Sequence, residues 1–229
     1  QRTISREGEL RGAGLHTGET ATLRVRPAPV DTGIVFRRTD LPEAPEIAAS
    51  VANVVATDRG TTLGAGGAKV HTVEHFLSAA VGAGVDNLLV ELDGPEPPAT
   101  DGSARPFLDL LKECGIEDQD APVRMVRISD TFSVQEGDSD YVAAPAAGFR
   151  LSTTIDFDHP LVGRQFHSFE LEPDAYEEQV SRARTFGFLR EVEALKSRGL
   201  AKGGSLENAV VLTDEGHLLT NAHVVGHAS

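Results

Sequence analysis

Residues 73–81 carry apolar side chains at helical spacing, and this pattern constrains the fold more than any other stretch of the chain. The apolar positions are Val73, Phe76, Leu77, Ala80 and Val81. Spacings of three and four residues predict an amphipathic helix with one face buried in a core. Glu74 and His75 fall in the first turn of this helix, where backbone N–H groups lack intrahelical partners and the helix dipole is positive.

The adjacent carboxylate and imidazole suit metal chemistry. A histidine at a helix start tends to stay neutral, as a metal ligand must, and a neighbouring glutamate can take a proton from metal-bound water. The alternative interpretation is an ordinary surface helix start with Thr72 as its N-cap.

Composition limits the class of protein. The 229 residues are 40% hydrophobic, which is enough for one large or two small packed domains. With 21 basic and 35 acidic residues the net charge is −14, the opposite of the field that a nucleic-acid binder presents. No apolar run approaches the ~20 residues of a membrane span, and no signal-peptide core follows the first residues, so we expect a cytoplasmic protein. Cys114 is the only cysteine, which leaves His, Asp and Glu as metal ligands.

The order of the predicted elements indicates an α+β fold. The first half contains predicted strands at 20–26, 33–38 and 87–92, and a second helix at 106–114. The polar stretch 115–122 separates it from predicted strands at 123–128, 149–157 and 209–212 and predicted helices at 173–181 and 188–198. We therefore predict two similar domains, residues 1–118 and 119–229, each a β-sheet with two helices, and expect the helices beginning at 73 and 106 to pack inward.

Several short motifs occur in a fixed order along almost the whole chain. They are GLHTG (14–18), RPAP (26–29), TGIVFRRTD (32–40), GTTL (60–63), TVEH (72–75), DGSARPF (101–107), IDFDHP (155–160), ARTFGF (183–188) and GLAKGGSLENAVV (199–211). In this order and spacing the chain resembles the UDP-3-O-acyl-N-acetylglucosamine deacetylase family of lipid A biosynthesis. Any one motif is weak, but nine in register make the resemblance specific.

The resemblance implies a zinc-dependent amidase that removes acetate from an acylated UDP-sugar. It implies two α+β domains with their helices sandwiched between two sheets and the active site at the junction. It also implies that an insert at about residues 188–203 forms an apolar passage for the fatty acyl chain.

The resemblance also assigns roles to individual residues. His75 matches a zinc ligand, Glu74 matches the general base, and Thr185 matches the residue that hydrogen-bonds the developing oxyanion. The residues that match the border of the substrate site are Gly60, Thr61, Phe186, Phe188 and Gly203. For the two phenylalanines, ordinary core packing is the alternative interpretation.

The chain departs from the family pattern near its end. The family's other two zinc ligands form a His-x-x-x-Asp pair on a helix, and no such pair occurs here. The junction of Asn221 and Ala222 resembles a splice across a missing segment, and the end at Ser229 resembles a cut before a further histidine. His223 and His227 have ligand spacing on a helix, but the alternating pattern around them favours a strand.

Two other functions fit parts of the pattern. A non-catalytic binding protein on the same fold would have lost its metal site. An inverted zincin would use His71 and His75 of the sequence HTVEH as two ligands on one helix face. The apolar pattern begins only at Val73, which places His71 before the helix and argues against the second possibility. The sequence gives no indication of oligomeric state.

Overall fold

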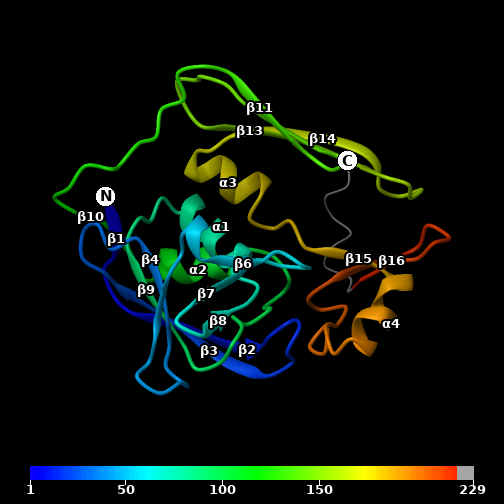
Figure 1. Cartoon of the computed structure of the whole chain (residues 1–229), viewed down its shortest axis with the longest axis horizontal. Helices are drawn as coiled ribbons and strands as arrows, with labels where there is room; N and C mark the ends of the chain where they lie inside the picture. The colour runs from blue at the N-terminus through cyan, green and yellow to red at the C-terminus, as the bar shows by residue number, and fades with distance from the viewer. Residues whose placement is uncertain (221–229) are drawn as a thin grey trace.

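The computed structural model describes residues 1–220, except for the side chains of Glu193 and Lys196, and shows a mixed α+β fold (Figure 1). The α+β class predicted from the sequence is confirmed. None of the described helices is long and apolar enough to cross a membrane. The junction at Asn221 and the histidines His223 and His227 lie outside the described residues, so these expectations stay predictions.

A five-stranded sheet forms the centre of the first half. Its strands, in spatial order, are β2 (Gly8–Ala13), β3 (Thr20–Pro27), β9 (Leu88–Leu92), β4 (Ile34–Arg38) and β5 (Glu46–Ala48). β9 pairs antiparallel with β3 and parallel with β4. Along β3 the side chains of Ala21, Leu23 and Val25 are buried and the intervening ones are not, as their alternation predicts.

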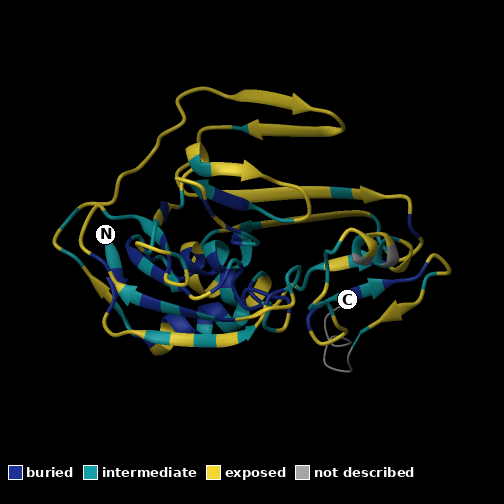
Figure 2. Cartoon of the chain, turned by 60° about the horizontal axis from the view of Figure 1, so that its bottom comes forward, coloured by how far each residue is buried: buried dark blue, intermediate teal, exposed yellow. Residues whose placement is uncertain are grey.

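Two helices cover one face of this sheet. They are α1 (Glu74–Gly82) and α2 (Arg105–Glu113), which contact each other. Phe76 of α1 meets Phe36 of β4 and Phe107 of α2 edge-on, with ring centroids 5.8 and 5.7 Å apart. The predicted inward packing of both helices is therefore confirmed, and Figure 2 shows the buried residues gathered between sheet and helices.

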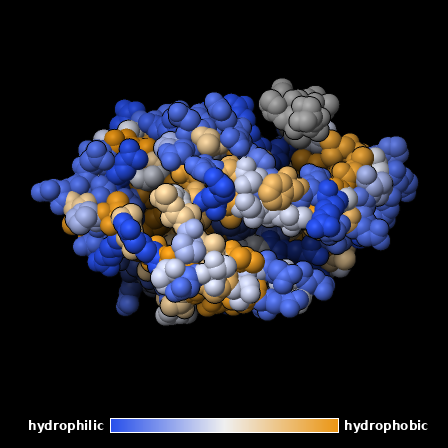
Figure 3. Space-filling view, turned by 90° about the horizontal axis from the view of Figure 1, so that it is seen from above, coloured by the Kyte–Doolittle hydropathy of each residue, from blue (hydrophilic) through white to orange (hydrophobic). Residues whose placement is uncertain are grey.

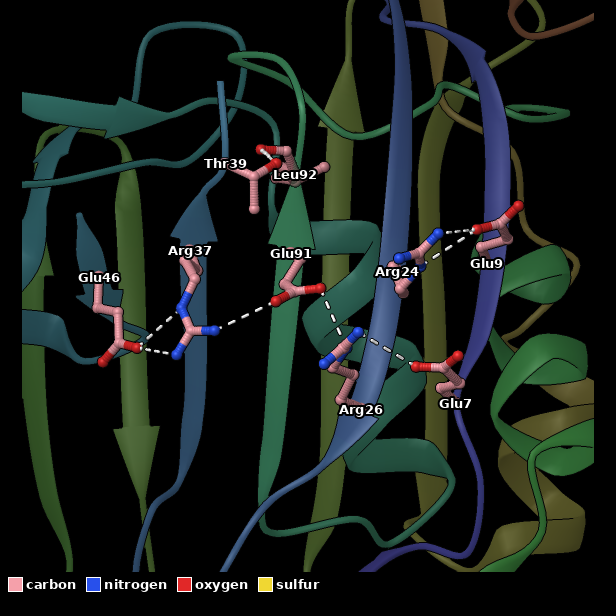
Figure 4. Close-up of polar contacts among 9 residues, drawn as sticks. All are labelled: Glu7, Glu9, Arg24, Arg26, Arg37, Thr39, Glu46, Glu91 and Leu92. Carbon is pink, nitrogen blue, oxygen red and sulfur yellow. Dashed lines mark hydrogen bonds and ion pairs between the residues drawn. The ribbon is translucent and has the colours of Figure 1, made fainter. Parts of the chain in front are cut away.

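The other face of the sheet carries a row of charged side chains (Figure 4). Glu91 lies between Arg37 and Arg26, with nitrogen–oxygen distances of 3.2 and 3.1 Å. Arg37 also pairs with Glu46, and Arg26 with Glu7. Alternating charges across neighbouring strands satisfy the cross-strand preference for opposite signs, and they mark this face as the solvent side of the sheet.

Two smaller sheets complete the first half. One consists of β6 (Val54–Ala56), β7 (Thr62–Ala65) and β8 (Ala68–Val70), preceded by a short 3-10 helix, η1 (Val51–Asn53). The other pairs β1 (Arg2–Ile4) with β10 (Ile116–Asp118). β10 falls inside the polar stretch 115–122 and is fixed to the first half by this pairing.

The strands of the second half form three separate sheets. β11 (Phe132–Glu136) pairs with β12 (Ser139–Ala143), and β13 (Arg150–Phe157) pairs with β14 (Gly163–Glu170). The third sheet contains β15 (Phe186–Phe188), β16 (Val210–Leu212) and β17 (Leu218–Leu219). The helices are α3 (Pro173–Gln179) and α4 (Leu189–Ser197). The predicted pair of helices is present, but the strands do not join into one sheet like that of the first half.

The two hairpins β11–β12 and β13–β14 are exposed along most of their length. Phe166, for example, exposes 69% of its surface. Figure 3, which views the molecule from above Figure 1, shows hydrophobic residues scattered among hydrophilic ones on this face. The alternation that predicts β13 therefore correctly gives a strand, but neither face of that strand is buried by the described residues.

The predicted strand at 123–128 is wrong. These residues form no strand, and Met125 and Val126 are exposed, Val126 by 95%. A strand requires a neighbour to pair its backbone groups, and no described segment pairs with this one.

Candidate functional site

Glu74 lies at the start of α1 with its carboxylate held by a neighbouring loop. Its Oε2 accepts a hydrogen bond from the backbone N–H of Thr61 at 2.8 Å. A Cβ atom added to Gly60 would lie 3.3 Å from Glu74 Oε1, so the glycine lets the loop approach the carboxylate closely. The structure therefore brings Gly60 and Thr61 together with Glu74 at the candidate site.

Thr72 does not cap the helix, contrary to the alternative interpretation of the sequence. Val73 occupies the N-cap position and makes no side-chain cap. Thr72 adopts a left-handed backbone conformation (φ 55°), and its hydroxyl donates to Glu96 Oε1 at 2.7 Å. The cap is lost because this conformation points the hydroxyl toward a buried carboxylate rather than toward the first-turn N–H groups.

His75 and Thr185 line one narrow pocket between the two halves. The pocket is lined by Leu15, Thr72, His75, Pro97, Pro98, Ala99, Gly102, Phe107, Thr185 and Asn208. His75 comes from the first turn of α1, and Thr185 directly precedes β15. Residues 110 positions apart in sequence thus face the same space, in agreement with the junction site that the resemblance implies.

Backbone contacts fix Thr185 in this place. Its N–H donates to the carbonyl of Gly102 at 3.0 Å, and its own carbonyl accepts from Val210 at 3.1 Å. Gly102 has a φ of 83°, and a Cβ there would lie 2.0 Å from the carbonyl oxygen of Asn208. Only glycine allows the turn of the DGSA motif to approach the second half this closely.

The two phenylalanines after Thr185 have different surroundings. Phe186 is 39% exposed and meets Phe157 edge-on at 5.5 Å. Phe188 is only 7% exposed and packs with Val210 and Leu212 in the small core of the second half. The side chain of Phe188 therefore adopts the core packing given above as its alternative, while Phe186 is partly exposed to solvent.

Gly203, at the end of the expected acyl insert, touches the loop of the GLHTG motif. Its N–H donates to the carbonyl of Leu15 at 3.1 Å, and a Cβ at Gly203 would lie 2.1 Å from the carbonyl oxygen of Gly14. A second pocket, of about 240 Å³, lies beside this contact. It is lined by His16, Thr17, Glu19, Asp58, Gly60, Thr62, His71, Thr72, Gly199, Leu200 and Lys202.

His71 and His75 line different pockets, which argues against the inverted zincin. His71 precedes α1 and lines the second pocket, whereas His75 lines the first. The ring Nδ1 of His71 lies 3.0 Å from the hydroxyl of Thr62. Burial lowers the pKa of the His71 imidazole, and the negative charge of Glu96 opposes this effect.

The described residues do not complete a metal site. A catalytic zinc takes three protein ligands and keeps one open position. Within residues 1–220, no three His, Cys, Asp or Glu side chains gather in a way that could hold a metal ion. His75 supplies one suitable donor beside a carboxylate, so the donor set read from residues 1–220 alone does not fit catalytic zinc.

Sequence reasoning missed Glu96, which is buried beside the site with 1% of its surface exposed. Glu96 stands between Pro95 and Pro97 after β9, and a charged residue in a proline-rich connection is ordinarily exposed. Asn208, which lines the first pocket, was also missed. Neither residue carries a sequence pattern of its own that points to the site.

Comparison with known proteins gives a consistent match over almost the whole chain. The sequence model of the family described as UDP-3-O-acyl N-acetylglycosamine deacetylase matches residues 1–225. A protein of Myxococcus xanthus named UDP-3-O-acyl-N-acetylglucosamine deacetylase is 50% identical over 214 residues, which cover 93% of this chain and 68% of that protein.

Two further relatives carry the same name. The protein of Pseudomonas entomophila is 48% identical over 220 residues, or 95% of this chain and 73% of its own length. The protein of Bdellovibrio bacteriovorus is 46% identical over 215 residues, or 94% of this chain and 71% of its own length.

Proposed function

The chain belongs to the UDP-3-O-acyl N-acetylglycosamine deacetylase family, and from this premise we propose that the pocket shared by His75 and Thr185 is the place where the N-acetyl group is hydrolysed. The protein is an amide hydrolase of lipid A biosynthesis that acts on UDP-3-O-acyl-N-acetylglucosamine. The observation that carries the proposed site is the meeting of the two halves at this pocket, with Glu74 beside His75 on the same helix turn.

Glu74 is the proposed general base. Its Oε2 is held by the N–H of Thr61, which fixes the orientation of the carboxylate and leaves Oε1 to accept a proton from water. A base held in place by the backbone needs no reorganisation when the proton moves.

Thr185 is the proposed donor to the oxyanion that forms when water adds to the acetyl carbonyl. Its backbone N–H and carbonyl are both bonded to neighbouring segments, so its position is fixed and its hydroxyl remains for substrate. A donor placed where negative charge develops lowers the barrier to hydrolysis.

The proposed cofactor is zinc, with His75 as one ligand. Zinc would supply electrophilic activation when bound. Since no three potential ligands gather within residues 1–220, the remaining ligands are not assigned to positions of this chain. The steps above are therefore those of Glu74 and Thr185 alone.

The proposed substrate border consists of Gly60, Thr61, Phe186 and Gly203, with Phe188 supporting Phe186 from the small core behind it. Gly60 and Thr61 border Glu74, and Gly203 places the insert against the GLHTG loop. The ring of Phe186 meets that of Phe188 edge-on at 6.0 Å. A UDP-sugar is an intermediate of the cell interior, which supports the expected cytoplasmic location.

The full-length protein provides the test of the proposed site. Acetate release from UDP-3-O-acyl-N-acetylglucosamine should require Thr185, and Thr185→Val should lower kcat by roughly 10²–10³-fold, as expected for removing one oxyanion donor. Thr185→Ser, which keeps the hydroxyl, is the matched control and should retain most of the activity. Equal loss in both variants would show that the hydroxyl does not take part.

A further inference from the structure

Glu96 is a buried carboxylate that accepts hydrogen bonds from two different segments. Its Oε1 accepts from the Thr72 hydroxyl at 2.7 Å. Its Oε2 accepts from the N–H and the hydroxyl of Thr17, both at 3.0 Å, and both oxygens lie 3.1 Å from the N–H of His16. Burying a carboxylate is costly unless its oxygens accept hydrogen bonds, so these donors are held to one point in the interior.

On one side, Glu96 fixes the residue from which α1 starts. Thr72 has a φ of 55°, a conformation that β-branched residues rarely adopt, and its bond to Glu96 holds it there. The next residue, Val73, donates its N–H to the carbonyl of Thr61 at 3.3 Å. Thr61 in turn donates to Glu74. The position of the Glu74 carboxylate thus depends on a short chain of contacts that begins at Glu96.

On the other side, Glu96 fixes the loop that receives the insert. A Cβ at Gly14 would lie 2.5 Å from Glu96 Oε2, so the loop can surround the carboxylate only with glycine there. Two carbonyls of the same loop accept hydrogen bonds from the insert. The carbonyl of Leu15 accepts from the N–H of Gly203 at 3.1 Å, and the carbonyl of His16 accepts from the N–H of Lys202 at 3.3 Å. The loop is therefore bonded to Glu96 inward and to the insert outward.

We propose that Glu96 is a positioning residue that joins the start of α1 to the insert and so sets Glu74 relative to the bound substrate. The proposal rests on the proposed function for its kinetic consequence. The structural consequence, that the two segments loosen together when the link is cut, is independent of that function. The hydrogen bonds of Glu96 come from Thr72, His16 and Thr17, none of which is a proposed catalytic residue, so Glu96 acts through Thr72 and the loop.

Amide hydrogen exchange in the metal-free, full-length protein tests the structural link. Thr72→Val removes the hydroxyl at constant shape, and Thr72→Ser keeps it. In Thr72→Val we expect exchange to speed up by about tenfold or more, the size expected for losing a hydrogen bond to a charged group. The increase should appear at the amides of Thr61 and Val73 and also at those of Lys202 and Gly203, while Thr72→Ser leaves all four near their original rates.

Tyr176→Phe is the control for a general loss of stability. It removes the bond between the Tyr176 hydroxyl and the hydroxyl of Ser78, 2.7 Å apart, which also joins the two halves but involves neither Glu96 nor Thr72. Tyr176→Phe should speed amide exchange around α3 without a larger effect on the four amides named above. Glu96 does not join the two segments if Thr72→Val speeds exchange only at the amides of Thr61 and Val73. The same conclusion follows if Thr72→Val gives the same exchange pattern as Tyr176→Phe.

Kinetics on the metal-loaded protein test the positioning of Glu74. Thr72→Val should lower kcat by about 10²-fold, the cost of displacing a catalytic group by about 1 Å, with a smaller change in KM. Thr72→Ser should keep kcat near that of the unaltered enzyme. Tyr176→Phe should also leave kcat unchanged when both variants are assayed well below their melting temperatures. A Thr72→Val enzyme with unchanged kcat would overturn the proposal. If the unaltered protein releases no acetate, the proposed function fails, and the exchange result still decides whether Glu96 joins the segments.

Discussion

Glu74, held by the N–H of Thr61, is the residue for which two explanations predict opposite results. As a general base it governs rate; as an acidic residue in the first turn it interacts with the helix dipole, worth ~0.3–1 kcal/mol of stability. Glu74→Gln retains an oxygen that can accept from Thr61 and removes the basicity.

We expect Glu74→Gln in the full-length protein to lower kcat by about 10²–10⁴-fold, with metal content and melting temperature nearly unchanged. Steady-state kinetics, metal analysis and thermal unfolding of the same preparation measure all three quantities. Normal turnover with a slightly lower melting temperature would instead favour the dipole explanation.

His75 is the one residue of the described chain to which we assign metal binding. His75→Ala should reduce the zinc bound per full-length chain, because one of the three protein ligands of a catalytic zinc is removed. His71→Ala is the matched control, since His71 lines the other pocket and should leave zinc content unchanged. Undiminished zinc in His75→Ala, measured after dialysis, would contradict the assignment.

Sequence patterns predict residues at this scale only where a local rule applies. Glu74 and His75 could be placed because the apolar period fixes the first turn of α1. Glu96 could not, because its burial depends on backbone N–H groups from residues 16 and 17, which come near it only in the folded chain. The alternative interpretation of Thr72 as the N-cap fails for the same reason, because its hydroxyl donates to Glu96, 24 positions away in sequence.

Among the elements, local patterns predicted some buried ones and also the exposed strand β13, but they failed at residues 123–128. α1, α2 and β9 agree with their predicted ranges to within about a residue, because each has a face buried in one core. The apolar residues at 123–128 follow the same local rules as a strand, yet they find no partner and remain exposed. Periodicity shows which secondary structure a segment can adopt, whereas the pairing of a strand depends on the rest of the chain.

The contact between α1 and α3 depends on a glycine. A Cβ at Gly82 would lie 2.1 Å from a ring carbon of Tyr176, a side chain that is buried against α1. Gly82→Ala should therefore lower the free energy of unfolding by about 1–3 kcal/mol through overpacking, although alanine in a helix ordinarily gains about 0.5–1 kcal/mol over glycine.

A double-mutant cycle separates the two effects in Gly82→Ala. In a Tyr176→Ala background the clash is absent, so adding Gly82→Ala should cause no loss and bring the ordinary gain of alanine. Denaturant unfolding of the four proteins measures the coupling. An equal loss in both backgrounds would mean that the ring of Tyr176 is not what Gly82 accommodates.

At the scale of the molecule, the halves meet around the site. One contact passes from the GLHTG loop to residues 202 and 203, and another from Gly102 to Thr185. Two exposed ion pairs, Arg59 with Glu191 and Arg198 with Asp58, join the loop before Gly60 to the insert. Exposed pairs contribute little stability, so the backbone contacts define the geometry. The α+β class was predictable from the order of elements. A site at the junction of the halves followed only from the resemblance, and no local pattern predicted the contacts that form it.

The insert is the part of the second half that the proposed function requires to face the substrate, and Leu200 gives a direct test of it. Leu200 lines the pocket of about 240 Å³ together with Gly60 and His71. If this pocket receives the acyl chain, Leu200→Ser should lower kcat/KM for the acylated substrate by roughly tenfold or more, as expected for losing apolar contact with a substrate. The variant should treat an analogue without the acyl chain as the unaltered enzyme does, because that analogue never made the contact.

Leu206→Ser is the matched control. Leu206 follows the insert, is exposed and does not line the pocket, so Leu206→Ser should turn over both substrates normally. Equal loss on both substrates in Leu200→Ser would show that Leu200 supports the fold of the insert, and an unaltered enzyme indifferent to the acyl chain would mean that the pocket binds some other part of the substrate.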